Sequence, residues 1–176
     1  GGTPRLLATN AVWPSWSRNG RWVYYYSDRS GRYEIWKSLA DGAGQPVQVT
    51  LNGGYAGRES PDGKFLYYLK PGAELWRLPV AGGPEVRVLE GSGLASTWPT
   101  APSMNWAPLD EGVLVIDGTQ RVLRFFPASG QGHVSSREIP GIVAGPGLSL
   151  SPDGRWLLVT RLSRAAVDVM LIDNFR

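Results

Sequence analysis

The sequence contains no cysteine and a single histidine, His133. A chain without cysteine has no disulfide framework, no thiolate metal site and no cysteine nucleophile. One histidine also excludes a multi-histidine metal site within one chain. Neither a phosphate-binding loop nor a zinc signature is present in the sequence. We therefore expect no metal and no cofactor.

Lysine is scarce as well: Lys37, Lys64 and Lys70 are the only three, and the net charge is +3. The basic residues are scattered among acidic ones, whereas a surface that binds duplex nucleic acid concentrates lysine and arginine on one stripe. No apolar run approaches the ~18 residues of a membrane span. We therefore expect neither direct binding of nucleic acid nor a membrane span.

Glycine and proline are abundant instead, with 23 and 14 of the 176 residues. This share is nearly twice the usual one and predicts many turns. Hydrophobic residues make 42% and charged residues 19% of the chain, which is the composition of a globular protein. The length fits one compact domain.

One tight-turn pattern occurs three times and, in degraded form, a fourth time. Its Asn-Gly or Asp-Gly pair favours the positive φ angles of a hairpin turn. The Asn or Asp residues lie at positions 19, 62, 110 and 153, so the spacings are 43, 48 and 43 residues. Such a period is typical of four-stranded propeller blades. The copies are Ser17–Arg21, Ser60–Lys64, the degraded Ala107–Gly112, and Ser151–Arg155.

Runs of β-branched and aromatic residues follow each turn and predict strands. The first strand after each turn is expected at Trp22–Tyr26, Phe65–Leu69, Val113–Ile116 and Trp156–Thr160. The second is expected at Tyr33–Leu39, Glu74–Val80, Val122–Phe126 and Val167–Ile172, and a short third at Pro46–Thr50, Glu85–Leu89 and Ser136–Ile139. The strand before each turn, such as Pro14–Trp16, completes four per unit. The sequence thus predicts an all-β propeller with four blades of four antiparallel strands, and no helix.

The whole chain, residues 1–176, is expected to form one propeller domain with units at about 8–50, 51–90, 99–140 and 141–176. Residues 1–7 resemble an outer strand, and we expect them to close the last blade, because unpaired sheet edges invite pairing. Three arrangements stay open: a four-bladed ring, an eight-bladed homodimer that exchanges edge strands, or part of a larger propeller.

The chain resembles the TolB-like, WD-repeat-like β-propellers of bacteria over essentially its whole length. The resemblance rests on Pro14–Ser17, Tyr24–Gly31, Glu34–Lys37, Glu59–Lys64 and Leu148–Arg176. The last stretch resembles the C-terminus of large bacterial proteins in which the propeller follows a CadC-like winged-helix regulator or a Ser/Thr protein kinase. Because the sequence begins without methionine, we interpret it as a piece of such a protein, cytoplasmic or periplasmic.

The sequence offers little for catalysis. A hydrolase needs a nucleophile, a base and an orienting group within reach of one another. His133 lies in a polar, glycine-rich stretch, and no G-x-S-x-G nucleophile elbow is present. The turn residues Asp62, Asp110 and Asp153 fall on separate blades and are explained by turn hydrogen bonds. We therefore expect the chain not to be an enzyme.

Glu59 is the first candidate for a ligand site. Aligned on the turns, its position is filled by Trp16, Trp106 and Leu150 in the other units. An acid in an apolar position must be neutralised, paired or hydrated. Its neighbour Arg58 points to the opposite face of the strand, so we expect the partner of Glu59 to come from another blade or to be a bound cation. A structural salt bridge is favoured over a ligand site.

A second set of candidates is aromatic and basic: Trp13, Trp98, Arg29, Arg32 and Tyr33. Both tryptophans lie beside prolines in predicted loops, and the other three follow the first hairpin. Exposed tryptophan, tyrosine and arginine are typical of interface hot spots. We expect this set, with Glu59 and Arg58, to contact a protein or small-molecule ligand at the channel or loop face of the propeller.

Together these patterns favour a binding module, the sensory or scaffold part of a bacterial signalling or transcription-regulating protein. Two alternatives are the substrate-gating propeller of a prolyl-oligopeptidase-type serine peptidase and a TolB-type periplasmic adaptor.

Overall fold

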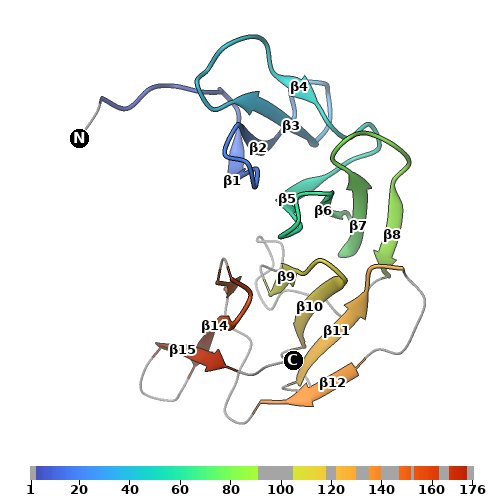
Figure 1. Cartoon of the computed structure of the whole chain (residues 1–176). Coiled ribbons are helices and arrows are strands. Elements are labelled where there is room, and N and C mark those ends of the chain that lie inside the picture. The colour runs from blue at the N-terminus through green and yellow to red at the C-terminus, as the bar shows by residue number, and fades with distance from the viewer. Residues whose placement is uncertain are drawn as a thin grey trace. The chain divides into compact units, whose positions relative to one another are not determined.

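The computed structural model describes residues 3–90, 105–117, 122–129, 135–139, 147–151, 153–162 and 167–173. Over these residues the protein consists of β-strands and turns (Figure 1). The described part contains no helix that could cross a membrane. The strands form four antiparallel sheets in which sequence neighbours pair, as in propeller blades. The predicted all-β propeller class is thus confirmed.

Each sheet is one blade, numbered in chain order. Blade 1 contains β1 (Val12–Trp16), β2 (Trp22–Ser27), β3 (Glu34–Leu39) and β4 (Val47–Gln48). Blade 2 contains β5 (Tyr55–Glu59), β6 (Phe65–Lys70), β7 (Glu74–Pro79) and β8 (Val86–Leu89). Blade 3 contains β9 (Trp106–Pro108), β10 (Gly112–Asp117), β11 (Val122–Pro127) and β12 (Ser135–Glu138). Blade 4 contains, among the described residues, β13 (Leu148–Leu150), β14 (Trp156–Leu162) and β15 (Val167–Asp173).

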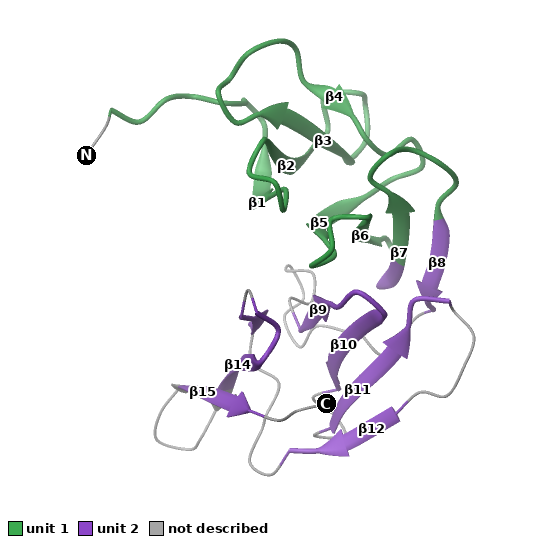
Figure 2. Cartoon of the chain, in the orientation of Figure 1, with its two compact units in different colours: residues 1–71, 76–85 green, residues 72–75, 86–176 purple. Residues whose placement is uncertain are grey.

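The chain divides into two compact units (Figure 2). Unit 1 comprises residues 1–71 and 76–85, and thus blade 1 and most of blade 2. Unit 2 comprises residues 72–75 and 86–176, and thus blades 3 and 4 together with β8. Each unit has its own apolar core. The core of unit 1 is formed by Tyr24, Ile35, Leu66, Tyr68 and Leu78, and that of unit 2 by a leucine-rich cluster on blades 3 and 4.

The repeated turn owes its shape to a serine and an Asn or Asp two residues later. In blade 1 the Ser17 hydroxyl bonds Asn19 Oδ1 at 2.9 Å and accepts the Trp22 N–H at 2.9 Å. Asn19 Oδ1 also accepts the Arg21 N–H at 3.0 Å. Gly20 follows with a φ of 69°, which glycine adopts at little cost. Blades 2 and 4 repeat these bonds with Ser60 and Asp62 and with Ser151 and Asp153.

The degraded turn of blade 3 has a different shape. This difference changes which residue of blade 3 corresponds to Glu59. The Leu109 N–H donates to the Gly112 carbonyl at 2.8 Å, which closes a turn with two central residues. Pro108 therefore pairs with Val113 and takes the position that Glu59 has in blade 2. The expectation that Trp106 fills this position is wrong, because the shorter turn shifts it two residues into the strand.

Most strands lie within a residue or two of their expected bounds, and the differences occur at strand ends. Trp13 was expected in a loop, but it belongs to β1. Thr3–Leu7 form no strand, and the Arg5 guanidinium donates to the Ala40 carbonyl at 2.9 Å. Closure of the last blade by residues 1–7 stays a prediction, as do the three ways of closing a ring.

Candidate functional site

Four aromatic side chains of unit 1 meet at one end of its strands: Trp13, Tyr26, Tyr33 and Tyr55, here called the aromatic patch. Trp13 lies in β1, Tyr26 in β2, Tyr33 directly before β3, and Tyr55 at the start of β5. Blades 1 and 2 both contribute to the patch. Of the residues expected from the sequence, Trp13 and Tyr33 are thus brought together. Tyr26 and Tyr55, which the sequence analysis did not name as candidates, join them.

The rings contact one another edge to face around Tyr26. Its ring centroid lies 5.4 Å from that of Trp13, 5.3 Å from that of Tyr33 and 6.3 Å from that of Tyr55. Trp13 and Tyr55 are 6.4 Å apart. Tyr33 is 55% exposed, and the other three rings are half-buried. Such edge-to-face contacts hold the rings in fixed orientations, so the exposed ring of Tyr33 stands on a rigid aromatic base.

A β-bulge places Trp13 in this patch. The pairing of β1 with β2 shifts between Val12 and Ser15, and Trp13 has a φ of 52°. A bulky side chain in the left-handed region costs about 1–2 kcal/mol. Blade 2 repeats the bulge after Tyr55, but there the residue with positive φ is the small Ala56, at 54°. Blade 1 therefore has a tryptophan at the strained position where blade 2 has an alanine.

The patch is uncharged. Burial, and the neighbouring Tyr33, raise the pKa of Tyr26 above its usual value. Burial also raises the pKa of Tyr55, with a further contribution from Tyr26. The Tyr55 hydroxyl donates to the Lys70 carbonyl at 2.9 Å. The patch thus offers aromatic surface and neutral hydroxyl groups to a ligand at physiological pH.

Glu34, which the sequence analysis did not single out, fixes the backbone beneath the patch. Its carboxylate is fully buried and accepts the Thr50 hydroxyl at 2.6 Å and the Gly53 N–H at 3.0 Å. The Arg32 guanidinium pairs with the same carboxylate at 2.6 Å. These bonds join the start of β3, next to Tyr33, to the loop that enters β5 at Tyr55. No local sequence pattern marks Glu34, because its partners other than Arg32 come from a loop 16 to 19 residues away.

Arg29 contacts its own hairpin and the segment before β1. Its guanidinium stacks over the rings of Trp36 and Tyr25 at 5.0 and 5.5 Å. It also donates to the Thr9 carbonyl at 3.1 Å. Arg29 therefore ties the segment before β1 to blade 1, while Arg32 neutralises Glu34. Direct contact of either arginine with a ligand stays a prediction.

Glu59 lies at the other end of β5, about 13 Å along the strand from Tyr55. It is 6% exposed, and it accepts the Tyr24 hydroxyl and the Arg18 N–H, each at 2.6 Å. Both partners belong to blade 1, as expected for an inter-blade contact. The sequence favours an ion pair here, whereas the described partners are a hydroxyl and a backbone amide. Burial, and the bond to Glu59, raise the pKa of Tyr24 far above its usual value, so its hydroxyl stays protonated and donates.

The other residues considered in the sequence analysis form no second site among the described residues. Arg58 is half-buried next to Glu59, and burial lowers the pKa of its guanidinium. Trp98 and His133 lie outside the described residues. Within the described part of the chain, no three acidic or histidine side chains gather as metal ligands would. The proposed ligand contacts of Glu59 and Arg58 stay predictions.

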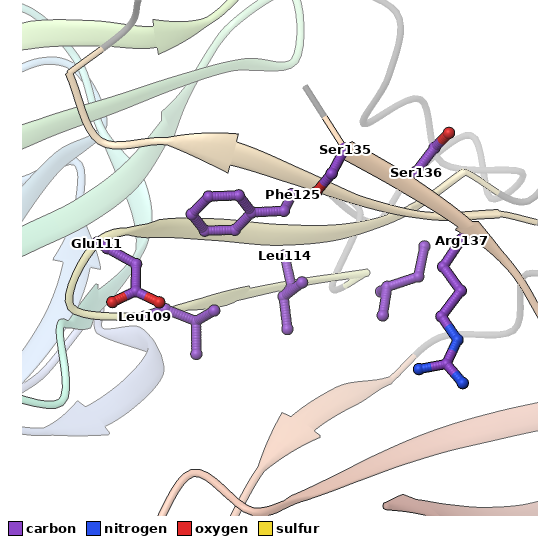
Figure 3. A pocket seen from close by; sticks show the side chains of 8 residues that line it. Leu109, Glu111, Leu114, Phe125, Ser135, Ser136 and Arg137 are labelled. Carbon is purple, nitrogen blue, oxygen red and sulfur yellow. The ribbon is translucent and has the colours of Figure 1, made fainter. Parts of the chain in front are cut away.

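Unit 2 contains a cavity of about 300 Å³ on blade 3, which the sequence analysis did not anticipate (Figure 3). Its wall is formed by Leu109, Leu114, Leu123 and Phe125, with Glu111 and Arg137 at opposite ends in the view and Ser135 and Ser136 from β12. The three leucines also belong to the apolar cluster of unit 2. The cavity therefore lies between this core and residues of the edge strand β12.

Comparisons with known proteins place the fold. No family model matches the chain. An uncharacterized protein of Agrobacterium fabrum is 26% identical over 124 aligned positions, an alignment that covers 65% of this chain and 40% of that protein. The structure of TolB from Acinetobacter baumannii matches with a TM-score of 0.62 and 15% identity, covering 93% of this chain and 41% of TolB. A periplasmic gluconolactonase of Pseudomonas aeruginosa matches with a TM-score of 0.54 and 17% identity, covering 91% of this chain and 49% of that one.

These matches correct one expectation from the sequence. The chain was expected not to be an enzyme, because it lacks a nucleophile elbow and a catalytic triad. This exclusion is wrong, since the propellers similar in fold to this chain include a gluconolactonase. The structural neighbours of the chain are TolB-like β-propellers, and the chain spans half or less of the length of the relatives described above.

Proposed function

We propose that this chain is a binding module that holds a segment of a partner protein against the aromatic patch. The aromatic patch itself supports the proposal. Its rings come from two blades and contact one another, and the ring of Tyr33 is exposed to solvent. Tryptophan and tyrosine are the side chains that most often dominate protein interfaces. Strained backbone such as that of Trp13 is concentrated at functional sites.

The chemistry of the aromatic patch indicates which kind of partner segment it would bind. Arg29 and Arg32 are engaged with their own blade, and the tyrosine hydroxyls are neutral. A segment with proline, aromatic or aliphatic side chains would gain apolar contact with the rings and hydrogen bonds from hydroxyl groups. A strongly acidic segment would find no unengaged cation in the patch itself.

The biological setting is proposed on resemblance alone: the sensory or scaffold part of a bacterial signalling or transcription-regulating protein. A TolB-type adaptor is the second candidate, favoured by the similarity in fold to TolB of Acinetobacter baumannii. The sequence of the full-length protein separates the two. A winged-helix or kinase domain before the propeller supports the first, and a signal peptide supports the second.

Selection of peptides from a random displayed library tests the binding proposal. Peptides selected on the wild-type chain are measured for Kd against Tyr33→Ala and against Val86→Ala, a control at an exposed residue of β8. We expect Tyr33→Ala to weaken binding at least tenfold, as for interface hot spots, and Val86→Ala to leave it unchanged. Selected peptides that bind Tyr33→Ala as tightly as the wild type would contradict the proposal.

A further inference from the structure

The cavity on blade 3 combines an apolar wall with an acidic end, Glu111, and a basic end, Arg137 (Figure 3). All of its lining residues belong to blade 3, so the cavity is formed within unit 2. In the sheet, Leu114 lies opposite Phe125. Leu123 lies opposite Arg137 on the same face. Leu114 and Leu123 are 4% and 3% exposed, whereas Arg137 is exposed. The cavity therefore extends from buried leucines to a charged residue at the surface.

Two adjacent positions of the repeat differ in blade 3. The backbone hydrogen bond that closes each turn identifies the equivalent residues. Its acceptor carbonyl belongs to Trp22, Phe65 and Trp156 in the other blades and to Gly112 in blade 3. The residue before the acceptor is Arg21, Lys64 and Arg155 in the other blades and Glu111 in blade 3. Blade 3 thus lacks the large aromatic side chain of the other blades and carries an acid where they carry a base.

The missing side chain explains why blade 3 has space for a cavity. A methyl group at Gly112 would come within 2.6 Å of the Phe125 ring, well inside the contact distance of about 3.5–4.0 Å between carbon atoms. The Phe125 ring therefore lies across the glycine and takes part of the space that a side chain there would need. The cavity of about 300 Å³ remains beside this ring.

We propose that this cavity binds a small elongated molecule with an ammonium group at one end, a carboxylate at the other and a hydrocarbon middle. The Glu111 carboxylate binds the ammonium group, and the Arg137 guanidinium binds the ligand carboxylate. A guanidinium has five N–H donors, so Arg137 can bind the ligand in addition to a partner in the protein. The middle is a hydrocarbon, because polar groups against Leu114 and Leu123 would lose their hydrogen bonds to water.

Strand register and volume set the size of the ligand. The Glu111 carbonyl accepts the Ala128 N–H at 2.8 Å, and Arg137 pairs with Leu123. Positions 123 and 128 are about 16 Å apart along an extended strand, and the two charged side chains cover part of this span. The cavity has the volume of about ten water molecules. The compound 8-aminooctanoate, with about as many non-hydrogen atoms, meets both conditions. This site is independent of the aromatic patch.

Isothermal titration calorimetry of the full chain with three probes of equal chain length tests the proposal. We expect 8-aminooctanoate to bind at least about fivefold more tightly than octanoate or octylamine, because each of these lacks one ion pair. Trialanine offers the same charged ends with peptide groups in the middle, and we expect it to bind more weakly. Equal affinities for the three probes, or no binding of 8-aminooctanoate at millimolar concentration, would overturn the proposal. Tighter binding of trialanine would overturn the hydrocarbon middle.

Variants at the two ends give the sharpest outcome. Glu111→Gln should weaken 8-aminooctanoate about fivefold and leave octanoate unchanged, whereas Arg137→Gln should weaken 8-aminooctanoate and leave octylamine unchanged. Leu114→Phe should abolish binding, because the added ring occupies the cavity. Leu158→Phe, the same change at an exposed leucine of unit 2, is the control and should bind normally. Circular dichroism verifies that the variants fold. End variants that bind all probes like the wild type, or binding retained by Leu114→Phe, would contradict the assignment.

Discussion

The two units join their blades with different chemistry. In unit 1, hydrogen bonds from Tyr24 and Arg18 to Glu59, and from Ser15 to Gly57, cross from blade 1 to blade 2. In unit 2, blades 3 and 4 meet through apolar residues such as Leu114 and Leu148, beside a cavity of about 300 Å³. Buried hydrogen bonds accept one geometry only, whereas aliphatic side chains tolerate several. The aromatic patch thus lies in the unit whose blades are held in one defined arrangement.

The largest expected effect comes from Glu59→Ala. The substitution removes both hydrogen bonds to the carboxylate and leaves the buried Tyr24 hydroxyl without this acceptor. We expect the free energy of unfolding to fall by about 3 kcal/mol, measured by urea denaturation. Leu150→Ala, at the same position of blade 4, is the matched change in unit 2. It should cost about half as much, because Leu150 is only partly buried. A loss below about 1 kcal/mol for Glu59→Ala would show that the polar contact does not define the interface.

Replacing a leucine by phenylalanine should change the stability of the protein in opposite directions in the two cores. Leu66→Phe enlarges a side chain that is fully buried in the core of unit 1, and overpacking costs about 1–3 kcal/mol. Leu114→Phe points the same extra volume at the cavity in unit 2 and should raise stability by about 0.5–1 kcal/mol. Thermal unfolding of the two variants measures both changes. Equal destabilisation would contradict the difference in packing.

The smallest expected effect is a pH dependence that originates in unit 1. Burial alone would raise the pKa of Glu85, but hydrogen bonds from Lys70 and Tyr68 hold it below its usual value. The folded chain therefore binds this proton more weakly than the unfolded chain, so the contribution is present at neutral pH and lost as the pH falls below about 4.5. Thermal unfolding between about pH 3 and 7 should show a flatter acid decline for Glu85→Gln, by less than about 1 kcal/mol. An unchanged slope would exclude Glu85 as a source of acid sensitivity.

Local chemistry explains which parts of the fold could be predicted from the sequence. The Ser-x-Asp-Gly turns form their hydrogen bonds within six residues, so they could be predicted from the sequence without knowledge of tertiary contacts. The blade 3 turn was misaligned, because the sequence does not reveal that Leu109 and Gly112 close a shorter loop. The partner of Glu59 was expected to be a salt bridge from another blade or a bound cation, whereas the described partners are the Tyr24 hydroxyl and the Arg18 amide, which depend on how the blades pack.

The aromatic patch could be predicted only in part. Trp13 and Tyr33 were singled out for their residue types, whereas Tyr26 and Tyr55 were not among the candidates. Their meeting depends on the bulge at Trp13, and a positive φ at a tryptophan has no signal in the sequence. Glu34 was missed for a related reason, since its bonds reach a loop that follows β4.

The most direct test of the central claim, that the rigid unit 1 binds partners through the aromatic patch, is NMR of the tryptophan indole N–H groups. The chain has 8 tryptophans, and they serve as reporters across both units. On titration with a selected peptide, we predict that the largest shift belongs to Trp13 and that Trp106 and Trp156 of unit 2 stay unchanged. Larger shifts at Trp106 or Trp156 than at Trp13 would place the binding site in unit 2 and contradict the account.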